Sequence, residues 1–456
     1  MQVPEHKRGE FQHLKKALAD KQITAIIGPR RVGKSVLIQQ LIKDLLDGKV
    51  PSKRILFAQL DEPRFENEGS LLIGKILETY FKHILGRSPQ DLEGKVFVFL
   101  DEVQSMEKWS EVLKSYYDRD YRIKFVVSGS SAAGITRGSS ESLAGRVSIN
   151  LVLTLRFADY LGFRGVDGDF DGVGMKLRHK IRDALDANDP ELLWSNLKGF
   201  SAGLVPTQHR IETLLGEYMV KGGYIELLDQ TDYGKCIQYL KDLLQLVIYK
   251  DMVKVFGVRN PRNIEDLLLF LGNHSAELFS ESGTSSKLGI KNQTVSEYMG
   301  YLEGTFLIST SMIYAANRSK QIRNPRKVYL ADTGMRNMLN GTYSPMALTD
   351  SKDVGLIAET AVHNHLLRLG FFLDPYNAKC YYWKNGSEID NVVVYAKKPI
   401  PVEVKYQNEI GPEDLESCAR FMEDNGSPFA IMITKNKLAY KDGIFCIPLW
   451  CFLLIC

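Results

Sequence analysis

The pattern of apolar and polar residues predicts alternating strands and helices in the first third of the chain. Short runs of β-branched and aromatic residues are typical of buried strands, and apolar residues three and four positions apart are typical of helices. Strands that alternate with helices favour an α/β fold with a parallel sheet. The expected strands are 23–27, 54–60, 95–100, 124–130 and 148–155, and the expected helices are 5–18, 36–46, 71–85 and 109–117.

The loop after the first strand has the pattern of a phosphate-binding loop (P-loop). Its sequence is Gly28-Pro29-Arg30-Arg31-Val32-Gly33-Lys34-Ser35-Val36, which contains G-x-x-x-x-G-K-S. Such a loop directs backbone N–H groups at phosphate oxygens, and the following helix adds its positive N-terminus. We expect Lys34 to bind the β- and γ-phosphates of ATP and Ser35 to bind Mg²⁺. A chance glycine turn is the alternative, and the flanking strand and amphipathic helix argue against it.

Two carboxylates, Asp101 and Glu102, follow the third strand. Asp101 is a candidate Mg²⁺ residue, and Glu102 can polarise a water for attack on the γ-phosphorus. The strand that ends at Ser128 and Ser130 can insert between this strand and the P-loop strand, which brings a hydroxyl near the γ-phosphate. A serine-rich turn without such a role is the alternative.

Arg146 precedes the last expected strand, at the edge of the sheet. A guanidinium there can neutralise charge on the transferred phosphoryl group, either in its own subunit or in a neighbouring one. The second arrangement requires a homo-oligomer, of which a ring is one form. A surface arginine in a salt bridge is the alternative.

These motifs resemble those of AAA+-like ATPases of archaea and bacteria that carry a C-terminal nuclease-like domain. The resemblance covers nearly the whole chain and implies a helical lid after the P-loop core. Where the group has Gly-Gly-x-Pro-Glu near the start of the lid, this chain has Gly222-Gly-Tyr-Ile-Glu226. Besides the P-loop, the matching segments are Phe99-Leu-Asp-Glu-Val-Gln104 with Trp109, Ser128-Gly-Ser-Ser131, Leu143-Ala-Gly-Arg146 and Leu155-Arg-Phe-Ala-Asp-Tyr-Leu161.

Residues 285–302 have the layout of a helix-turn-helix. A short helix ends near Gly289, and a longer helix follows. Val295, Met299 and Leu302 recur at helical spacing, so we expect them to share the buried face of the second helix.

The opposite face of that helix is polar and suited to nucleic acid. Asn292, Gln293 and Ser296 offer amides and a hydroxyl that can contact phosphates or base edges. A basic run that includes Arg323 and Lys327 can form a wing along the DNA backbone. Modules of this kind also bind proteins, so DNA and a protein partner both stay open.

The C-terminal part of the chain holds a second candidate metal site. Asp390 starts an alternating strand, and the return strand of the same hairpin carries Glu403 and Lys405 on one face. The carboxylates, together with Glu359 from a helix, can hold Mg²⁺, while Lys405 stabilises a pentacoordinate phosphate. The set resembles the core of PD-(D/E)xK nucleases, which implies a restriction-endonuclease-like fold. Charged alternation on any exposed strand also produces Glu-x-Lys, and the fold can serve binding alone.

Composition sets limits on these readings. The formal net charge of +3 is too small to indicate nucleic-acid binding by itself, so any basic surface must be local. The six cysteines have neither zinc-site nor disulfide spacing and suit a reducing cytoplasm. The apolar stretch 445–456 is interrupted by Pro448 and too short to span a bilayer, so we expect a buried strand and tail and no membrane contact.

We therefore expect an α/β protein of four parts. They are an AAA+-like P-loop ATPase core (1–165), a helical lid (166–271), a winged helix-turn-helix (272–345) and a PD-(D/E)xK nuclease-like domain (346–456). The expected function is Mg²⁺-dependent ATP hydrolysis coupled to DNA binding or processing. The alternatives are a metal-dependent deoxyribonuclease gated by nucleotide, and a nucleotide switch that docks a protein partner and has a non-catalytic nuclease-like domain.

Overall fold

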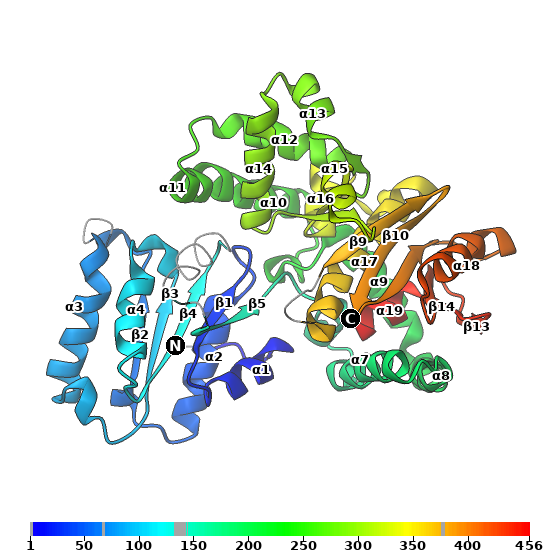
Figure 1. Ribbon diagram of the computed structural model, residues 1–456. Coiled ribbons are helices and arrows are strands. Elements are labelled where there is room, and N and C mark those ends of the chain that lie inside the picture. The colour runs from blue at the N-terminus through cyan, green and yellow to red at the C-terminus, as the bar shows by residue number, and fades with distance from the viewer. Residues whose placement is uncertain (1–2, 66–68, 132–142, 144, 375–378) are drawn as a thin grey trace. The chain divides into compact units, whose positions relative to one another are not determined.

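The computed structural model describes residues 3–65, 69–131, 143, 145–374 and 379–456. Contacts within the chain divide it into two compact units (Figure 1). Unit 1 consists of Met1–Leu153 with two later segments, Tyr249–Arg259 and Gly304–Phe306. Unit 2 comprises Thr154–Ile248, Asn260–Glu303 and Leu307–Cys456.

A five-stranded parallel sheet forms the centre of unit 1. Its strands are β1 (Ile23–Ile27), β2 (Ile55–Gln59), β3 (Val96–Asp101), β4 (Ile123–Gly129) and β5 (Val147–Leu151). The spatial order is β2-β3-β4-β1-β5, and every pair of neighbours is parallel. The predicted insertion of the strand before Ser128 between the P-loop strand and the carboxylate strand is therefore confirmed.

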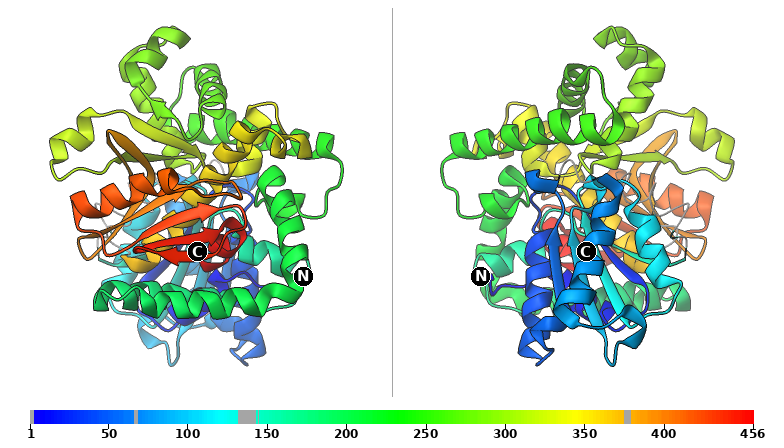
Figure 2. Two further views of the ribbon diagram at one scale, coloured as in Figure 1. Left: turned by 90° about the vertical axis from the view of Figure 1, so that its right-hand side faces the viewer. Right: turned by 90° about the vertical axis from the view of Figure 1, so that its left-hand side faces the viewer.

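Helices cover the sheet of unit 1, and the right-hand view of Figure 2 shows them in front of its strands. Among the described residues of this unit, the α-helices are α1 (Glu10–Ala17), α2 (Lys34–Asp47), α3 (Leu72–Thr79), α4 (Trp109–Tyr117) and α11 (Val253–Phe256). Every residue of β1 and β3 is buried, as expected for the inner strands of a parallel sheet.

Unit 2 contains a mixed nine-stranded sheet. Its strands are β6 (Leu278–Phe279), β7 (Ile308–Ile313), β8 (Arg326–Leu330), β9 (Cys380–Asn385), β10 (Ser387–Tyr395), β11 (Lys398–Val404), β12 (Ala430–Thr434), β13 (Ala439–Lys441) and β14 (Ile444–Pro448). The order is β13-β14-β12-β11-β10-β9-β7-β8-β6. Because β7 pairs with β9, one sheet crosses the boundary that the sequence predicts at residues 345 and 346.

Helices form the rest of unit 2. They are α6 (Phe157–Phe163), α7 (Phe170–Ala187), α8 (Glu191–Leu204), α9 (Gln208–Lys221), α10 (Tyr233–Gln245), α12 (Pro261–Asn273), α13 (Glu281–Leu288), α14 (Asn292–Gly304), α15 (Arg318–Arg323), α16 (Thr333–Leu339), α17 (Ser351–Leu373), α18 (Pro412–Asn425) and α19 (Leu449–Ile455). The apolar C-terminal stretch forms β14 and α19, whose residues are all buried, so the predicted burial of this stretch is confirmed. Within the described ranges, no helix is both long enough and apolar enough to cross a membrane.

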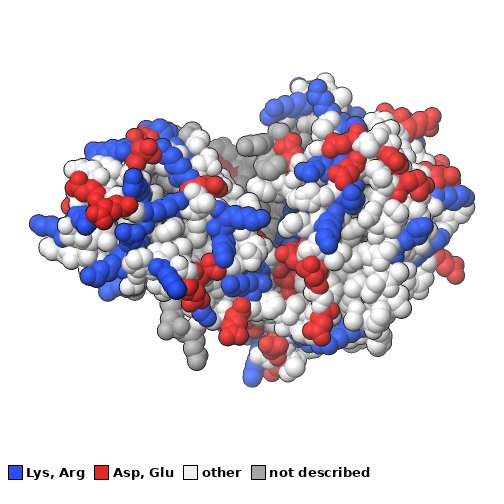
Figure 3. Space-filling model, turned by 90° about the horizontal axis from the view of Figure 1, so that it is seen from below, with Lys and Arg blue, Asp and Glu red and all other residues white. Residues whose placement is uncertain are grey.

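The surface carries both signs of charge. On the face seen in Figure 3, Lys and Arg side chains alternate with Asp and Glu side chains, in keeping with the small net charge of +3. All six cysteines are buried and free. Burial raises the pKa of the Cys418 and Cys451 thiols above the ordinary value, so both are neutral packing residues at neutral pH.

Candidate functional site

The P-loop connects the end of β1 to the start of α2. Gly33 is the N-cap residue of α2 with φ of 90°, a conformation that favours glycine. A Cβ atom at Gly28 would lie 1.7 Å from the carbonyl oxygen of Val152, so no side chain fits there. The two glycines of the motif are thus required by backbone geometry.

The Lys34 side chain lies folded against this loop. Its Nζ donates to the carbonyl oxygens of Gly28 (3.0 Å) and Pro29 (2.8 Å), and the side chain is buried. Burial lowers the pKa of the ammonium, while the carboxylates of Glu102 and Asp101 partly oppose this effect. Phosphate oxygens can replace the two carbonyls as acceptors without the ammonium leaving the loop.

Ser35, the last residue of the G-x-x-x-x-G-K-S motif, contacts Asp101 at the end of β3. The Ser35 Oγ donates to Asp101 Oδ2 at 2.6 Å. Burial raises the pKa of Asp101, and the hydroxyls of Ser128 and Ser35 oppose that shift. A serine hydroxyl and a carboxylate are oxygen ligands of the kind that Mg²⁺ prefers, so the residues present fit this ion.

Ser128 contacts both Asp101, the last residue of β3, and the backbone of Glu102. Its hydroxyl donates to Asp101 Oδ1 and accepts a hydrogen bond from the backbone N of Glu102 at 3.1 Å. Ser128 is fully buried, so its hydroxyl orients the Asp101 carboxylate and the backbone at Glu102. Its predicted contact with the γ-phosphate stays a prediction.

Glu102 is held by a residue that the sequence analysis did not single out for a role. The Nε2 of Gln104 donates to Glu102 Oε2 and also to Ser130 Oγ, at 3.0 Å. Gln104 is the last residue of the segment Phe99–Gln104, two residues after Glu102, but the motif alone does not predict a role for its side chain. The structure gives Gln104 the task of orienting the candidate base.

A pocket beside Glu102 is lined partly by residues from a distant part of the chain. It is lined by Arg30, Asp61, Glu102, Gln104, Ser105, Ser130, Lys250, Asp251, Lys254 and Val255. The last four of these belong to Tyr249–Arg259, which counts with unit 1. Arg30 of the P-loop forms a two-point ion pair with Asp251, with Nη2 and Oδ1 2.8 Å apart. Neither local pattern nor spacing in the sequence points to this segment.

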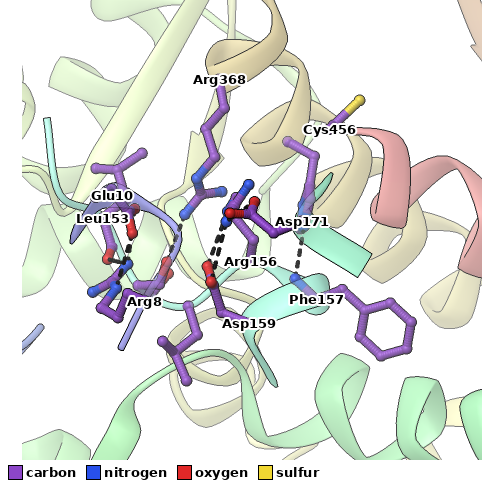
Figure 4. Close-up of polar contacts among 12 residues, drawn as sticks. Arg8, Glu10, Leu153, Arg156, Phe157, Asp159, Asp171, Arg368 and Cys456 are labelled. Atoms are coloured by element: carbon purple, nitrogen blue, oxygen red, sulfur yellow. Dashed lines mark hydrogen bonds and ion pairs between the residues drawn. The ribbon is translucent and has the colours of Figure 1, made fainter. Parts of the chain in front are cut away.

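Arg8 supports the P-loop from outside the motif. Its Nη1 donates to the carbonyl oxygen of Val32 at 2.6 Å, and its Nη2 donates to that of Leu153 at 2.8 Å. Figure 4 shows Arg8 with Glu10 and Leu153. Arg8 is 4% exposed, although its charged sequence surroundings indicate an exposed helix start.

The structure corrects the prediction that Arg146 can act in its own subunit. The backbone N of Ile23 donates to the carbonyl oxygen of Arg146, so this residue lies at the amino end of β1. The P-loop follows the carboxyl end of that strand, roughly 16 Å away at about 3.3 Å per residue. Arg146 instead pairs with Asp118, with Nε and Oδ1 2.7 Å apart. Action on a neighbouring subunit stays a prediction.

The predicted C-terminal hairpin is confirmed. β10 and β11 are antiparallel and connected by a tight turn at Ala396 and Lys397. The Asp390 N donates to Glu403 Oε2 at 3.1 Å, and the Glu403 Oε1 lies 3.0 Å from Lys405 Nζ. Burial, followed by the charge of Asp390, raises the pKa of Glu403 to about 8.

Glu359 on α17 joins this cluster, as the sequence predicts. Burial and the charge of Asp390 raise its pKa to about 8, and Tyr329 OH donates to its Oε1 at 2.8 Å. Among the described residues, no group of three or more His, Cys, Asp and Glu side chains is arranged to hold a metal ion. The metal role of Glu359, Asp390 and Glu403 stays a prediction.

Lys327 is not part of an exposed basic wing, which corrects its predicted position. It is 3% exposed, and its ammonium contacts Glu359, Glu388 and Asp390. Alternation along β8 turns Lys327 inward, where three carboxylates compensate its charge. Arg323 on α15, by contrast, is exposed as predicted.

The helix-turn-helix layout is present as α13, a turn at Gly289 and α14. Val295, Met299 and Leu302 are buried, as predicted. The three polar residues proposed to contact DNA, Asn292, Gln293 and Ser296, are exposed on α14. Binding of DNA by this element stays a prediction.

Two other segments carry the family resemblance, Leu155–Leu161 and the one from Leu143 to Arg146. In Leu155–Leu161, Arg156 donates to Asp159 and Asp171, and Figure 4 shows this group. In the segment from Leu143 to Arg146, Ala144 lies outside the described residues.

Comparison with known protein families identifies the N-terminal part of the chain. Residues 20–161 match the family described as an AAA domain. Residues 212–345 and 354–452 match two families described as domains of unknown function, DUF8612 and DUF4143. The N-terminal region is therefore a P-loop domain of the AAA type, and a domain of this type implies nucleotide binding.

Relatives of similar length occur in bacteria and archaea. The chain is 21% identical over 427 residues to an uncharacterized protein of Haemophilus influenzae, covering 92% of each. It is 24% identical over 409 residues to an uncharacterized protein of Methanocaldococcus jannaschii, covering 87% of this chain and 77% of the relative.

Two solved structures align with a low TM-score. The C. elegans PCH-2 structure has a TM-score of 0.24 and 15% identity, over 39% of this chain and 45% of that chain. A DNA polymerase III gamma subunit-related protein of Thermotoga maritima has a TM-score of 0.24 and 13% identity, over 65% of this chain and 99% of that chain.

Proposed function

We propose that unit 1 binds ATP with Mg²⁺ and hydrolyses it. The observation that carries this proposal is the 2.6 Å hydrogen bond from Ser35 to Asp101, with Glu102 as the next residue. It joins the end of the P-loop to the Asp101 carboxylate at the end of β3, as metal-dependent phosphoryl transfer requires. The match of residues 20–161 to an AAA domain supports the same function.

Each residue of the site has a distinct task in this proposal. Bound Mg²⁺ supplies neutralisation of charge on the phosphate oxygens. Lys34 donates to phosphate oxygens in place of the Gly28 and Pro29 carbonyls. Glu102 accepts the proton of the attacking water at a carboxylate oxygen, and Gln104 holds that carboxylate in place.

Phosphate release by the purified full-length chain, with Mg²⁺ or with EDTA, tests the proposal. We expect Mg²⁺-dependent release that Lys34→Ala abolishes together with ATP binding, because the β/γ-phosphates lose their cation. Glu102→Gln is expected to retain ATP binding and to lower turnover by about 10²-fold or more, since the amide cannot act as a base. Turnover that survives Lys34→Ala would contradict the assignment.

We also propose that the α13–α14 element binds DNA, and that nucleotide turnover is coupled to this binding. The exposed amides and hydroxyl of Asn292, Gln293 and Ser296 on one helix support this reading. Anisotropy of labelled duplex DNA, measured over a salt series, tests it. Arg323→Ala is expected to weaken binding and to reduce the salt slope by about one unit. Absence of salt-sensitive binding would favour docking of a protein partner instead.

A further inference from the structure

A buried ammonium lies at the centre of the C-terminal carboxylate cluster. Lys327 Nζ is 2.9 Å from Glu388 Oε1, 3.0 Å from Asp390 Oδ1 and 3.1 Å from Glu359 Oε1. An ammonium has three N–H donors, so each can be directed at a different carboxylate. These three contacts satisfy the hydrogen-bonding capacity of Lys327 and compensate its buried charge.

The backbone of the sheet fixes Lys327 in this place. Lys327 on β8 pairs with Ser311 on β7. The next strands of the same sheet are β9, which pairs with β7, and β10, which pairs with β9 and carries Asp390. Tyr329, two residues further on, faces the same side and donates to Glu359. Strand pairing therefore fixes the Cα position of Lys327. Its side chain does not reach the cluster from the surface of the unit.

Oxygens of Asp390 and Glu403 in the cluster also have other partners. Asp390 Oδ2 accepts from the backbone N of Val404 at 3.1 Å. The two oxygens of Glu403 are occupied by the Asp390 N and by Lys405 Nζ. A Mg²⁺ ion that bridges Glu359 and Asp390 needs their oxygens at about 2.1 Å. The ammonium of Lys327 already bridges them, and two cations cannot share this space.

We propose that Lys327 is the resident cation of this cluster and that it excludes divalent metal ions from Glu359 and Asp390. In this arrangement the hairpin with Asp390, Glu403 and Lys405 lacks the metal that phosphodiester cleavage by such residues requires. Lys327 instead joins β8, which follows the helix-turn-helix, to α17 and β10. The cluster therefore has a structural role, in which the ion pairs of Lys327 hold these elements together.

Binding of Mn²⁺ to the full-length chain without nucleotide, followed by the EPR signal of free Mn²⁺, tests this proposal. We expect Asp390→Asn to leave Mn²⁺ binding of the native protein unchanged. Lys327→Met removes the ammonium and is expected to bind Mn²⁺ at least tenfold more tightly, an effect that the added Asp390→Asn substitution removes. Lys327→Arg keeps the positive charge and is expected to behave like the native protein.

Two outcomes overturn the proposal. One is a native Mn²⁺ site that Asp390→Asn abolishes, because the cluster would then hold metal despite Lys327. The other is a Lys327→Met protein with native circular dichroism that gains no Mn²⁺ binding. If Lys327→Met does not fold, the Mn²⁺ affinities of the native and Asp390→Asn proteins still test the proposal, because both proteins keep Lys327.

Discussion

Arg30 in the P-loop and Asp251, 221 residues further along the chain, form a two-point ion pair beside Glu102. Burial raises the pKa of Asp251, while the Arg30 guanidinium opposes that shift. Asp251 lies in the π-helical turn Leu246–Met252, a feature frequent at functional sites. The chain on both sides of Tyr249–Arg259 belongs to unit 2.

Asp251→Asn is expected to tighten ATP binding. The substitution removes one negative charge next to the expected triphosphate and frees the Arg30 guanidinium for phosphate oxygens. We expect a gain of about 1 kcal/mol, roughly fivefold in Kd, measured by calorimetric titration with a non-hydrolysable ATP analogue. Asp266→Asn, an exposed carboxylate on α12, is the matched control. Weaker binding by Asp251→Asn would instead mean that the ion pair holds the P-loop in its binding conformation.

Arg8→Ala is expected to destabilise unit 1 and to weaken ATP binding. It leaves the buried Val32 carbonyl oxygen and the part-buried Leu153 carbonyl oxygen without their donor, at a cost of up to about 1–3 kcal/mol each, which is smaller where water replaces the donor. Thermal unfolding and ATP affinity measure the two effects. Glu10→Gln is the control, because it keeps Arg8 and both carbonyl contacts. An unchanged ATP affinity in a destabilised Arg8→Ala protein would restrict Arg8 to a role in folding.

The sequence predicts the strand, loop and helix around the P-loop because their determinants are local. A strand, a glycine loop and a helix follow one another around Lys34, and chain order suffices to place β4 between β3 and β1. The hairpin of Asp390 and Glu403 is predictable for the same reason, since alternation and a short turn fix its register. The hairpin residues lie on consecutive strands, whereas Ser35 meets Asp101 because the P-loop and Asp101 lie at the carboxyl ends of parallel strands of one sheet.

The parts that the sequence does not reveal depend on distant elements. Asp251 reaches Arg30 only through the fold, and no spacing rule relates the two. Lys327 lies in a basic run, which favours an exposed wing, and its burial depends on carboxylates from α17 and β10. Burial of a lysine is favourable only with such partners, and a single sequence does not show which elements provide them.

Arg146 is expected to act across subunits. Mixing Arg146→Ala protein with Glu102→Gln protein should then restore part of the ATPase rate, because some interfaces combine an intact Glu102 with an intact Arg146. The measurement is phosphate release as a function of the mixing ratio, alongside the mass of the assembly. Asp118→Asn breaks the same salt bridge but keeps Arg146, so it should retain activity. No recovery in an oligomer that exchanges subunits would leave Arg146 as a salt-bridge residue.

His365 on α17 is expected to make unit 2 sensitive to acid. Its Nδ1 bonds the Ala361 carbonyl at 2.8 Å, so Nε2 is unprotonated and accepts from the Phe157 N at 3.1 Å. Burial lowers its pKa from 6.5 to about 3, so the unfolded chain binds the proton first and stability falls as pH drops below 6.5. The loss at pH 5 is about 2 kcal/mol, measured by urea unfolding at pH 5 and 7. His365→Gln should reduce this pH dependence, whereas His209→Gln, an exposed histidine on α9, should leave it unchanged. An equal pH dependence in native and His365→Gln proteins would show that other groups control acid unfolding.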